Sequence, residues 1–508
     1  MGFFGRLIKR RREEANEASE NVLFKELVLR AASRYDAARP SRELDAYWSR
    51  ADSLGGDAAL DPDTRRRLRE RSRYEFANNC YARGAGLLWA NAVVGSGPRP
   101  QLLGDDRKFN KRVEWAFCEW AEEIGLAAKL RSMRVSRFVD GEAFALLHGN
   151  PNLAGPVKLD VSPFDAERVR APYDSNDPLD VDGLKIDEYG NPVSYRVAST
   201  RLGDLSVDFC RYGSRRSVPS SWDVATKYKA NEVVHWFCRT FSEQRRGEPE
   251  LAVALPLFAL LRRYTLAVVA AAEIAADYAA VLSTNECAVE YGSKPPELPK
   301  WFDEVEIARG SATTLPEGYS LTQLRAEQPT TTYGDFKREL LGEIGRSLQI
   351  PVNLLLGDSS KHNYASGRLD WQEYARAIRL EQRECGVSVL RSIFAAWYRE
   401  FALVERQSGR SAFSPPPVAW YWDGFEHVDP KKEAEAQAIR LRSNATNLAI
   451  EYGKLGLDYE DALRQRANEI KLLRELGLPL DEAVPQTASS DDEDENEGED
   501  GDDEGDEN

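Results

Sequence analysis

The sequence contains little cysteine and histidine for its length, with six cysteines and four histidines among 508 residues. The cysteines are widely spaced, and no pair has the short separation of a zinc site or of a redox Cys-X-X-Cys motif. The histidines are scattered, without the spacing of zinc proteases. These shortages argue against a metal site and against a disulfide framework, and they favour a reducing compartment.

Sequence motifs for nucleotide binding and for nucleophilic catalysis are also missing. Gly453-Lys454 lacks the upstream glycine and the following Ser or Thr of a phosphate-binding loop, and Ser96 lacks a nucleophile-elbow pattern. The acidic stretch "DSNDPLDVDG" fails as a calcium loop, because placing Gly183 at the loop glycine puts Pro178 at the first ligand position. We therefore expect no cofactor, no metal and no enzymatic activity. A metal-dependent nuclease or phosphoesterase using acidic residues 174–188 is one alternative.

A long uncharged apolar run is absent as well. Tyr264–Leu282 is rich in Ala, Val and Leu, but it contains Glu273 and Asp277. An acidic residue at a bilayer centre costs roughly 2.5–3.5 kcal/mol, which a few aliphatic residues do not offset. The N-terminal "MGFFGRLIKRRREE" is basic with only a brief apolar start, unlike a signal peptide. We expect no membrane partner.

Acidic residues are concentrated at the C-terminal end. Residues 491–508 hold thirteen Asp and Glu and no Lys or Arg, and without them the formal charge of −16 would be −3. Such a block repels itself and buries nothing, so we expect a disordered, solubilising tail over residues 486–508. A tail that mimics nucleic acid or docks on a basic partner is the alternative.

Helix and strand patterns alternate in the first half of the chain. A helix is predicted at about Phe109 to Ile124, with Gly125 as its stop. Strand patterns then dominate up to about residue 240: "EAFALLHG", "VKLDVSPF", the hairpin "LKIDEYGNPVSYRV" and "NEVVHWFC". This mixture predicts an α+β fold.

Two helices flank a small insert in the second half. The first, from about Leu255 to Ser283, has an alanine-rich centre, "AVVAAAEIAADYAA". Alanine lets another backbone approach closely, which favours packing against identical neighbours over the core of a monomer. Residues 285 to 330 then combine prolines, glycines and short β runs. The second helix carries an apolar stripe of Phe336, Leu340, Leu341, Ile344 and Leu348.

A polar loop follows the second helix in "SLQIPVNLLLGDSSKHNYASGRLDW". Pro351 ends the helical pattern, and seven polar or small residues run from Gly357 to Asn363. A helical region is then predicted over 368–405, and Asp458 is a plausible N-cap of the last helix. The apolar positions of the 368–405 region are Ile378, Val389, Ile393, Trp397 and Phe401.

Seven segments follow one another along the chain: "NNCYARGAGLLWANAVVGSGPRPQ", "VDGEAFALL", "IDEYGNPVSYRV", "RRGEPEL", "LPEGYSLTQLRAEQPTTTYGDF", "IGRSLQIPVNLLLGDSSKHNYASGR" and "HVDPKKEAEA". Together they resemble the portal proteins of tailed phages, in the lambda-type family. Each is weak alone, but their order and spacing over about Asn78 to Leu478 are specific. The chain departs from the family at Glu248 and Glu250, which flank Pro249 where the family more often has an aliphatic and an aromatic residue.

The resemblance implies a symmetric ring of about twelve subunits at one capsid vertex, through which double-stranded DNA enters and leaves the head. It also implies the portal fold, with an α/β wing, a helical stem, a small α/β clip and a mainly helical crown. The implied parts are an N-terminal arm with helices (1–77), the wing (78–245), the first stem helix (246–284), the clip (285–330), the second stem helix (331–350), the tunnel-loop region (351–367), the wing-crown helices and crown (368–485) and the acidic tail (486–508).

The family's functional parts carry over to three groups of residues. They are a DNA-facing tunnel loop (Asp358, Ser359, Ser360, Lys361, His362 and Asn363), a clip that docks terminase and connectors (Lys300, Trp301, Phe302, Asp303 and Glu304), and stem residues that pack between subunits (Ala271, Ala275, Ala279, Leu341 and Ile344).

The partners that the resemblance implies are the terminase large subunit, a major capsid or scaffold protein and a head-completion connector protein. The family's motor is a separate terminase ATPase, which agrees with the missing phosphate loop. The protein would lie at the portal vertex of the virion after assembly in the host cytoplasm. Another ring-forming virion scaffold protein is the second alternative.

Overall fold

The computed structural model divides into two compact units, of which the first joins Met1–Asp61 to Arg239–Arg245. In the first unit, the backbone N–H of Arg245 donates to the Asp57 carboxylate at 2.8 Å, beside the short helix α2 (Gly56–Ala59). The second unit contains everything described below. The structure describes residues 53–172, 177–199, 225–277, 281–284, 319–322, 332–360, 363–407, 415–424 and 430–478.

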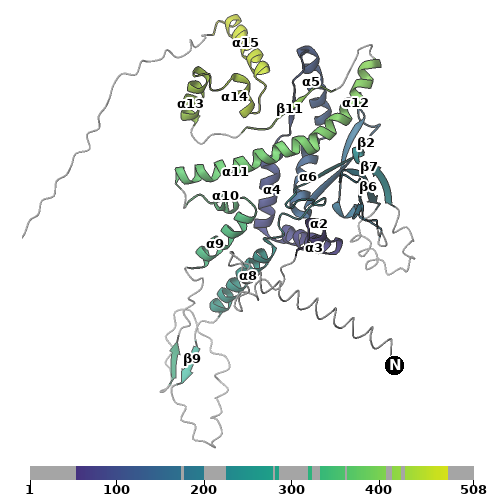
Figure 1. Cartoon of the computed structure of the whole chain (residues 1–508). Coiled ribbons are helices and arrows are strands. Elements are labelled where there is room, and N and C mark those ends of the chain that lie inside the picture. Colours follow the sequence, from purple (N-terminus) through teal and green to yellow (C-terminus); the bar gives the residue numbers. More distant parts are fainter. Residues whose placement is uncertain are drawn as a thin grey trace, which may run out of the picture. The chain divides into compact units, whose positions relative to one another are not determined.

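Four helices build the first part of the second unit (Figure 1). Gly125 adopts a φ of 64° between α5 and α6, as expected of the predicted stop. The helix α6 was not predicted, because Arg134 and Arg137 occupy buried positions that usually carry apolar residues. The helices are α3 (Pro62–Asn78), α4 (Cys80–Val94), α5 (Arg107–Glu123) and α6 (Leu126–Asp140).

Two antiparallel sheets follow. The strand β2 (Glu142–Gly149) lies between β3 (Leu159–Phe164) and β8 (Val233–Phe237), and β2 spans the predicted strand. The predicted hairpin is confirmed as β5 and β6, with the Asp187 carboxylate accepting from the backbone N–H of Asn191 at 2.7 Å in the turn. The second sheet contains β4 (Asp180–Val181), β5 (Leu184–Ile186), β6 (Pro192–Ala198) and β7 (Ala225–Lys229).

The alanine-rich helix is shorter than predicted. It forms α8 (Leu255–Asp277), and Val281–Thr284 is the strand β9 instead of a last helical turn. The expected helix to Ser283 is therefore wrong at its end. Residues 281–284 pair antiparallel with β10 (Tyr319–Thr322), and a strand there extends the chain away from the helix.

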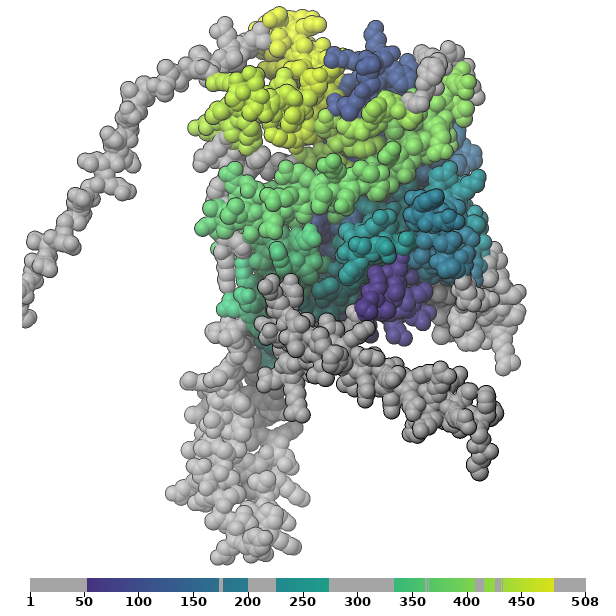
Figure 2. All heavy atoms as spheres, viewed as in Figure 1, coloured from purple at the N-terminus to yellow at the C-terminus, as the bar shows by residue number. Residues whose placement is uncertain are grey.

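A long helical rod runs through the second unit (Figure 1). It consists of α11 (Tyr364–Cys385), a π-helical turn at Gly386–Leu390 and α12 (Arg391–Gln407). Its surface forms a continuous green band in Figure 2. All five predicted apolar positions of this region, from Ile378 to Phe401, are buried. Phe117 of α5 packs edge-on against Trp397 with ring centroids 5.2 Å apart, so the rod shares one core with α5.

The C-terminal part of the second unit pairs with a strand near the beginning of the same unit. The strand β1 (Arg99–Leu102) pairs antiparallel with β11 (Val418–Tyr421), although more than 300 residues separate them. Three helices follow, α13 (Pro430–Arg442), α14 (Leu448–Lys454) and α15 (Tyr459–Glu475). The Asp458 side chain accepts from the backbone N–H groups of Glu460 and Asp461, which confirms the predicted N-cap.

Candidate functional site

The polar loop predicted at Gly357 to Asn363 lies between two helices. α10 (Val352–Leu356) ends at Gly357, whose φ of 66° is left-handed. The Asn363 side chain accepts from the backbone N–H of Ser366 at 2.8 Å and caps α11. Asp358, Ser359, Ser360 and Asn363 are exposed, whereas Lys361 and His362 lie outside the described residues. The described loop residues therefore face solvent between two fixed helix ends.

Asp358, the residue after Gly357 in the loop, is held by contacts of its backbone and of its side chain. The backbone N–H of Asp358 donates to the Asn353 carbonyl at 3.0 Å. The Asp358 carboxylate accepts from the backbone N–H of Ser360 at 2.9 Å. The guanidinium of Arg338, on α9 (Thr332–Ser347), lies 3.8 Å from the same carboxylate. These contacts position the start of the loop relative to α9 and α10.

A tight turn between α9 and α10 fixes the direction of the loop. Gln349 adopts a φ of 56°, and the backbone N–H of Ile350 donates to the Gly345 carbonyl at 2.9 Å. A side chain at Gly345 would approach the Ile350 carbonyl oxygen to 2.6 Å, so the turn needs glycine there. The indole N–H of Trp89 donates to the Leu348 carbonyl at 3.1 Å. α4 therefore anchors the turn in the core.

The stem residues predicted from the sequence divide into two groups. Leu341 and Ile344 have no exposed surface and pack in the core of the chain itself, so their assignment to contacts between subunits is wrong. Ala271 on α8 is half-buried and leaves surface for a neighbour. The side chain of Ala275 and the whole of Ala279 lie outside the described residues.

α8 exposes large apolar side chains on more than one side of the helix. Leu260, Leu266 and Val269 are 56%, 64% and 49% exposed. By length and composition alone, Leu255–Glu273 would be sufficient to cross a membrane, with a mean hydropathy of 1.5 and 17% of the apolar window buried. Apolar surface of this extent normally has a cover, which lipid or a neighbouring protein helix can supply.

Comparison with known proteins assigns the chain to a family. A family model described as phage portal protein, lambda family, matches residues 42–382, more than half of the chain. The chain belongs to this family. The matched residues include α8, α9, the exposed loop and most of α11. The loop and its supporting turn are therefore parts of a portal protein.

Individual relatives of this portal protein are distant. A probable portal protein of Halomonas phage phiHAP-1 is 22% identical over 180 residues, and the match spans about a third of each chain. A chain from a native gene transfer agent virion is 13% identical with a TM-score of 0.42, over 82% of this chain and 98% of that one. A chain from the neck of an empty gene transfer agent particle has a TM-score of 0.43, with the same identity and coverage.

The Arg-Gly motif of this portal protein, Arg245–Leu251, builds a buried ion cluster. The carboxylate of Glu142 on β2 is fully buried and accepts from Arg246 at 2.9 Å, from Arg69 and from the backbone N–H of Gly247 at 3.1 Å. Burial by itself would raise the pKa of Glu142, but Arg246 and Arg69 hold this pKa well below its usual value. The cluster therefore joins α3, β2 and the motif through charge.

Glu250, one of the two residues at which the motif departs from the family, has partners within the chain. Its carboxylate lies 3.1 Å from Arg134 and 3.3 Å from Arg137, both on α6. Glu381 on α11 pairs with the same two arginines. Glu250 therefore helps to connect α6 and the rod. No sequence signal identified these contacts, because the partners are separated by more than 100 residues.

The acidic stretch before the hairpin is occupied by protein contacts. Asp182 lies 3.1 Å from Arg65, Asp180 accepts from the backbone N–H of Gly183 at 2.7 Å, and Asp177 accepts from that of Leu179 at 3.0 Å. Within the part of the chain that the structure describes, no group of three or more His, Cys, Asp or Glu side chains is arranged to hold a metal ion. The nuclease alternative gains no support from these residues.

The predicted clip residues, Lys300 to Glu304, lie outside the described residues, as does the acidic tail. The sequence analysis did not identify the buried arginines Arg65, Arg69 and Arg246. A weak signal was available for Arg65 and Arg69, since their spacing of four places them on one face of a helix. Their acidic partner could not be identified from that spacing.

Proposed function

We propose that the protein is the subunit of a portal ring at one vertex of a phage capsid, with about twelve copies in closed symmetry. The exposed apolar side chains of α8 support this proposal, because α8 of a neighbouring copy would cover them. The half-buried Ala271 supports close approach of the two helices. In a closed ring, every copy makes the same contact with the copy on each side, so each α8 has a neighbour that can cover exposed apolar side chains.

In this ring, residues 358–363 would line the narrowest part of an axial channel for double-stranded DNA entering and leaving the head. Residues 358–363 are all polar, and they include one lysine, Lys361, and one histidine, His362, beside the acidic Asp358. DNA carries one phosphate charge per about 1.7 Å, and each basic contact adds affinity through counterion release. A weakly charged loop suits a channel through which DNA moves without being held.

The remaining partners are proposed from the family. The clip at 285–330 would dock the terminase large subunit and, later, a head-completion connector protein. The outer surface would meet a major capsid or scaffold protein. The role is structural and not enzymatic, with ATP hydrolysis left to terminase. The protein would assemble in the host cytoplasm and remain in the virion.

The main support for this proposal is the match of the portal family model to residues 42–382. Its test is native mass spectrometry of the purified protein together with negative-stain electron microscopy. We expect a closed ring of about twelve copies with a stain-filled axial channel. A species no larger than a dimer at micromolar concentration would contradict the ring, and a closed disc without a channel would contradict the DNA path.

A further inference from the structure

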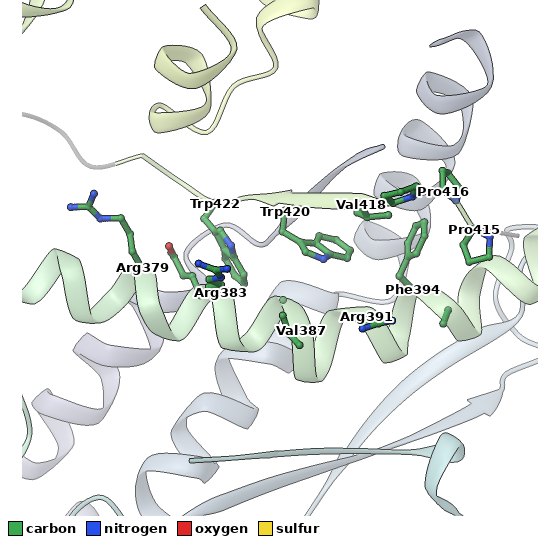
Figure 3. A pocket seen from close by; sticks show the side chains of 14 residues that line it. Arg379, Arg383, Val387, Arg391, Phe394, Pro415, Pro416, Val418, Trp420 and Trp422 are labelled. Carbon is green, nitrogen blue, oxygen red and sulfur yellow. The ribbon is translucent and has the colours of Figure 1, made fainter. Parts of the chain in front are cut away.

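A groove lies between the helical rod and β11 (Figure 3). Its volume is about 910 Å³. One wall is the rod, and the other is the segment from Pro415 to Trp422. Figure 3 shows Trp420 and Trp422 directed toward the rod, with Arg383 and Arg391 on the rod below them and Arg379 rising from the rod to the left of Trp422. The groove thus combines aromatic surface with three cationic side chains.

The π-helical turn shapes this groove. A side chain at Gly386 would lie 3.2 Å from Trp420, so glycine lets the indole approach the rod closely. The turn shifts the helical register between Arg383 and Arg391, and the exposed Val387 lies between them. Single π turns within helices are frequent at functional sites. Here the turn brings cationic and aromatic groups to one groove.

The three arginines are available to form ion pairs with an acidic ligand. All are exposed, and no carboxylate in the described part of the chain forms an ion pair with them. Arg379 donates from Nε to the Ala375 carbonyl at 3.2 Å, which orients the guanidinium and leaves its other N–H groups available for a carboxylate. The groove also presents the indole surfaces of Trp420 and Trp422 and the proline surface of Pro415–Pro417. An arginine–carboxylate ion pair beside such apolar surface is stronger than the same pair on a fully open surface, because less water surrounds it.

We propose that this arginine groove binds the acidic residues 491–508 of the protein's own chain. These residues supply thirteen carboxylates and no cation, which complements three arginines that lack a described acidic partner. The protein would thereby cover its own cationic groove and keep it from other polyanions, including DNA. The inference depends on the arginine groove and the tail, and not on the ring.

The described chain ends within reach of the groove. Tyr421 of β11 and Asp461 of α15 line one cavity of about 600 Å³, and the neighbouring Trp420 and Trp422 line the groove. From Asp461, α15 and its last residues carry the chain about 26 Å to Leu478. Residues 479–490 can extend it by up to roughly 40 Å more. Binding within one chain also gives the tail a high effective concentration.

The direct test is peptide binding to a full-length variant whose thirteen acidic residues in 491–508 are changed to Asn or Gln. A fluorescent peptide with the native 491–508 sequence is titrated by anisotropy. We expect binding that weakens with salt, about tenfold weaker after R379E and R383E are added, corresponding to the loss of two charge-assisted pairs. R376E with R399E is the matched control, because both arginines are exposed on the same rod outside the groove.

A second measurement uses the unmodified chain. Glutamyl endopeptidase cleaves within 491–508, and intact mass follows the rate. R379E with R383E should accelerate this cleavage, whereas R376E with R399E should not. Equal peptide affinity for the two double variants, or no peptide binding, would overturn the proposal. A short DNA duplex that binds at these arginines while the peptide does not would also overturn it and identify the groove as a phosphate site.

Discussion

The guanidinium of Arg338 lies 3.8 Å from the Asp358 carboxylate, which ties α9 to the start of the exposed loop. At the other end of the loop, the Asn363 side chain caps α11. In the sequence, residues 359–362 lie between these two fixed points. Their identity should influence what passes the loop and should have little effect on how the chain folds.

The first prediction follows from these fixed points. Replacing residues 359–362 with Gly-Ser-Gly-Ser, while keeping Asp358 and Asn363, should preserve folding and ring yield. Packaged or retained DNA should fall, because the ring loses the shape of its constriction. Ring yield and DNA per particle are compared in an in vitro packaging assay. Packaging and retention equal to wild type would show that the loop does not shape the DNA path.

The second prediction concerns Leu266, one of the exposed apolar residues of α8. Leu266→Glu should leave the monomer folded, because this side chain is 64% exposed, but it should prevent rings by placing a charge between copies. The control is Leu103→Glu, at a leucine that is 61% exposed and lies outside α8. Native mass spectrometry measures assembly, and circular dichroism measures folding. Rings formed equally well by both variants would exclude this face from the interface.

The third prediction concerns Ile344, which is buried in the core on α9. Ile344→Ala should reduce the free energy of unfolding by about 2–5 kcal/mol, because it leaves a cavity in the core. Any loss of rings should follow from this loss of stability. Chemical denaturation of the unassembled chain gives the value. If Ile344→Ala abolished rings with unchanged stability, the residue would belong to a subunit interface after all.

The fourth prediction concerns the buried carboxylate of Glu142. Glu142→Gln should cost about 3–5 kcal/mol, because Arg69 and Arg246 would lose the fully buried carboxylate that they share, and only Asp182, 3.5 Å from Arg246, would remain beside that guanidinium. Glu70→Gln, at a side chain that is 64% exposed, should change stability by less than about 0.5 kcal/mol. Urea unfolding measures both. A Glu142→Gln protein as stable as wild type would mean that the cluster contributes no net stability.

The fifth prediction is a dependence of stability on pH. Burial lowers the pKa of His235 despite its hydrogen bond to Glu142. The unfolded chain then binds a proton more readily than the folded one, so stability rises with pH between the lowered pKa and about 6.5. His235→Gln should remove this slope, which is at most about 1.4 kcal/mol per pH unit. If stability rises with pH equally steeply in the variant, another titratable group is responsible for the pH dependence.

Local patterns predicted several elements well. β2 and the β5–β6 hairpin were found because alternation and turn residues are encoded within a few neighbouring positions. The loop at 357–363 was found because Pro351 and Gly357 are strong local breaks. The end of α8 was misplaced, because an alanine-rich pattern continues without a break as far as the strand at Val281.

Contacts between distant segments could not be predicted. The pairing of Arg99 with Tyr421 joins residues whose local sequences carry no sign of each other. α6 was missed because Arg134 and Arg137 are neutralised by Glu250 and Glu381, and a pattern of apolar residues does not describe a buried arginine with distant partners. The same reason explains why Leu341 and Ile344 were assigned to subunit packing, since an apolar stripe does not say which chain covers it.

The most direct test of this account is a three-dimensional reconstruction of the assembled protein at side-chain resolution. The account predicts a closed ring in which residues 358–363 of every copy point toward the axis at the narrowest part of the channel, with α8 against α8 of the next copy. A ring in which these residues lie on the outer surface, or between subunits away from the axis, would contradict it.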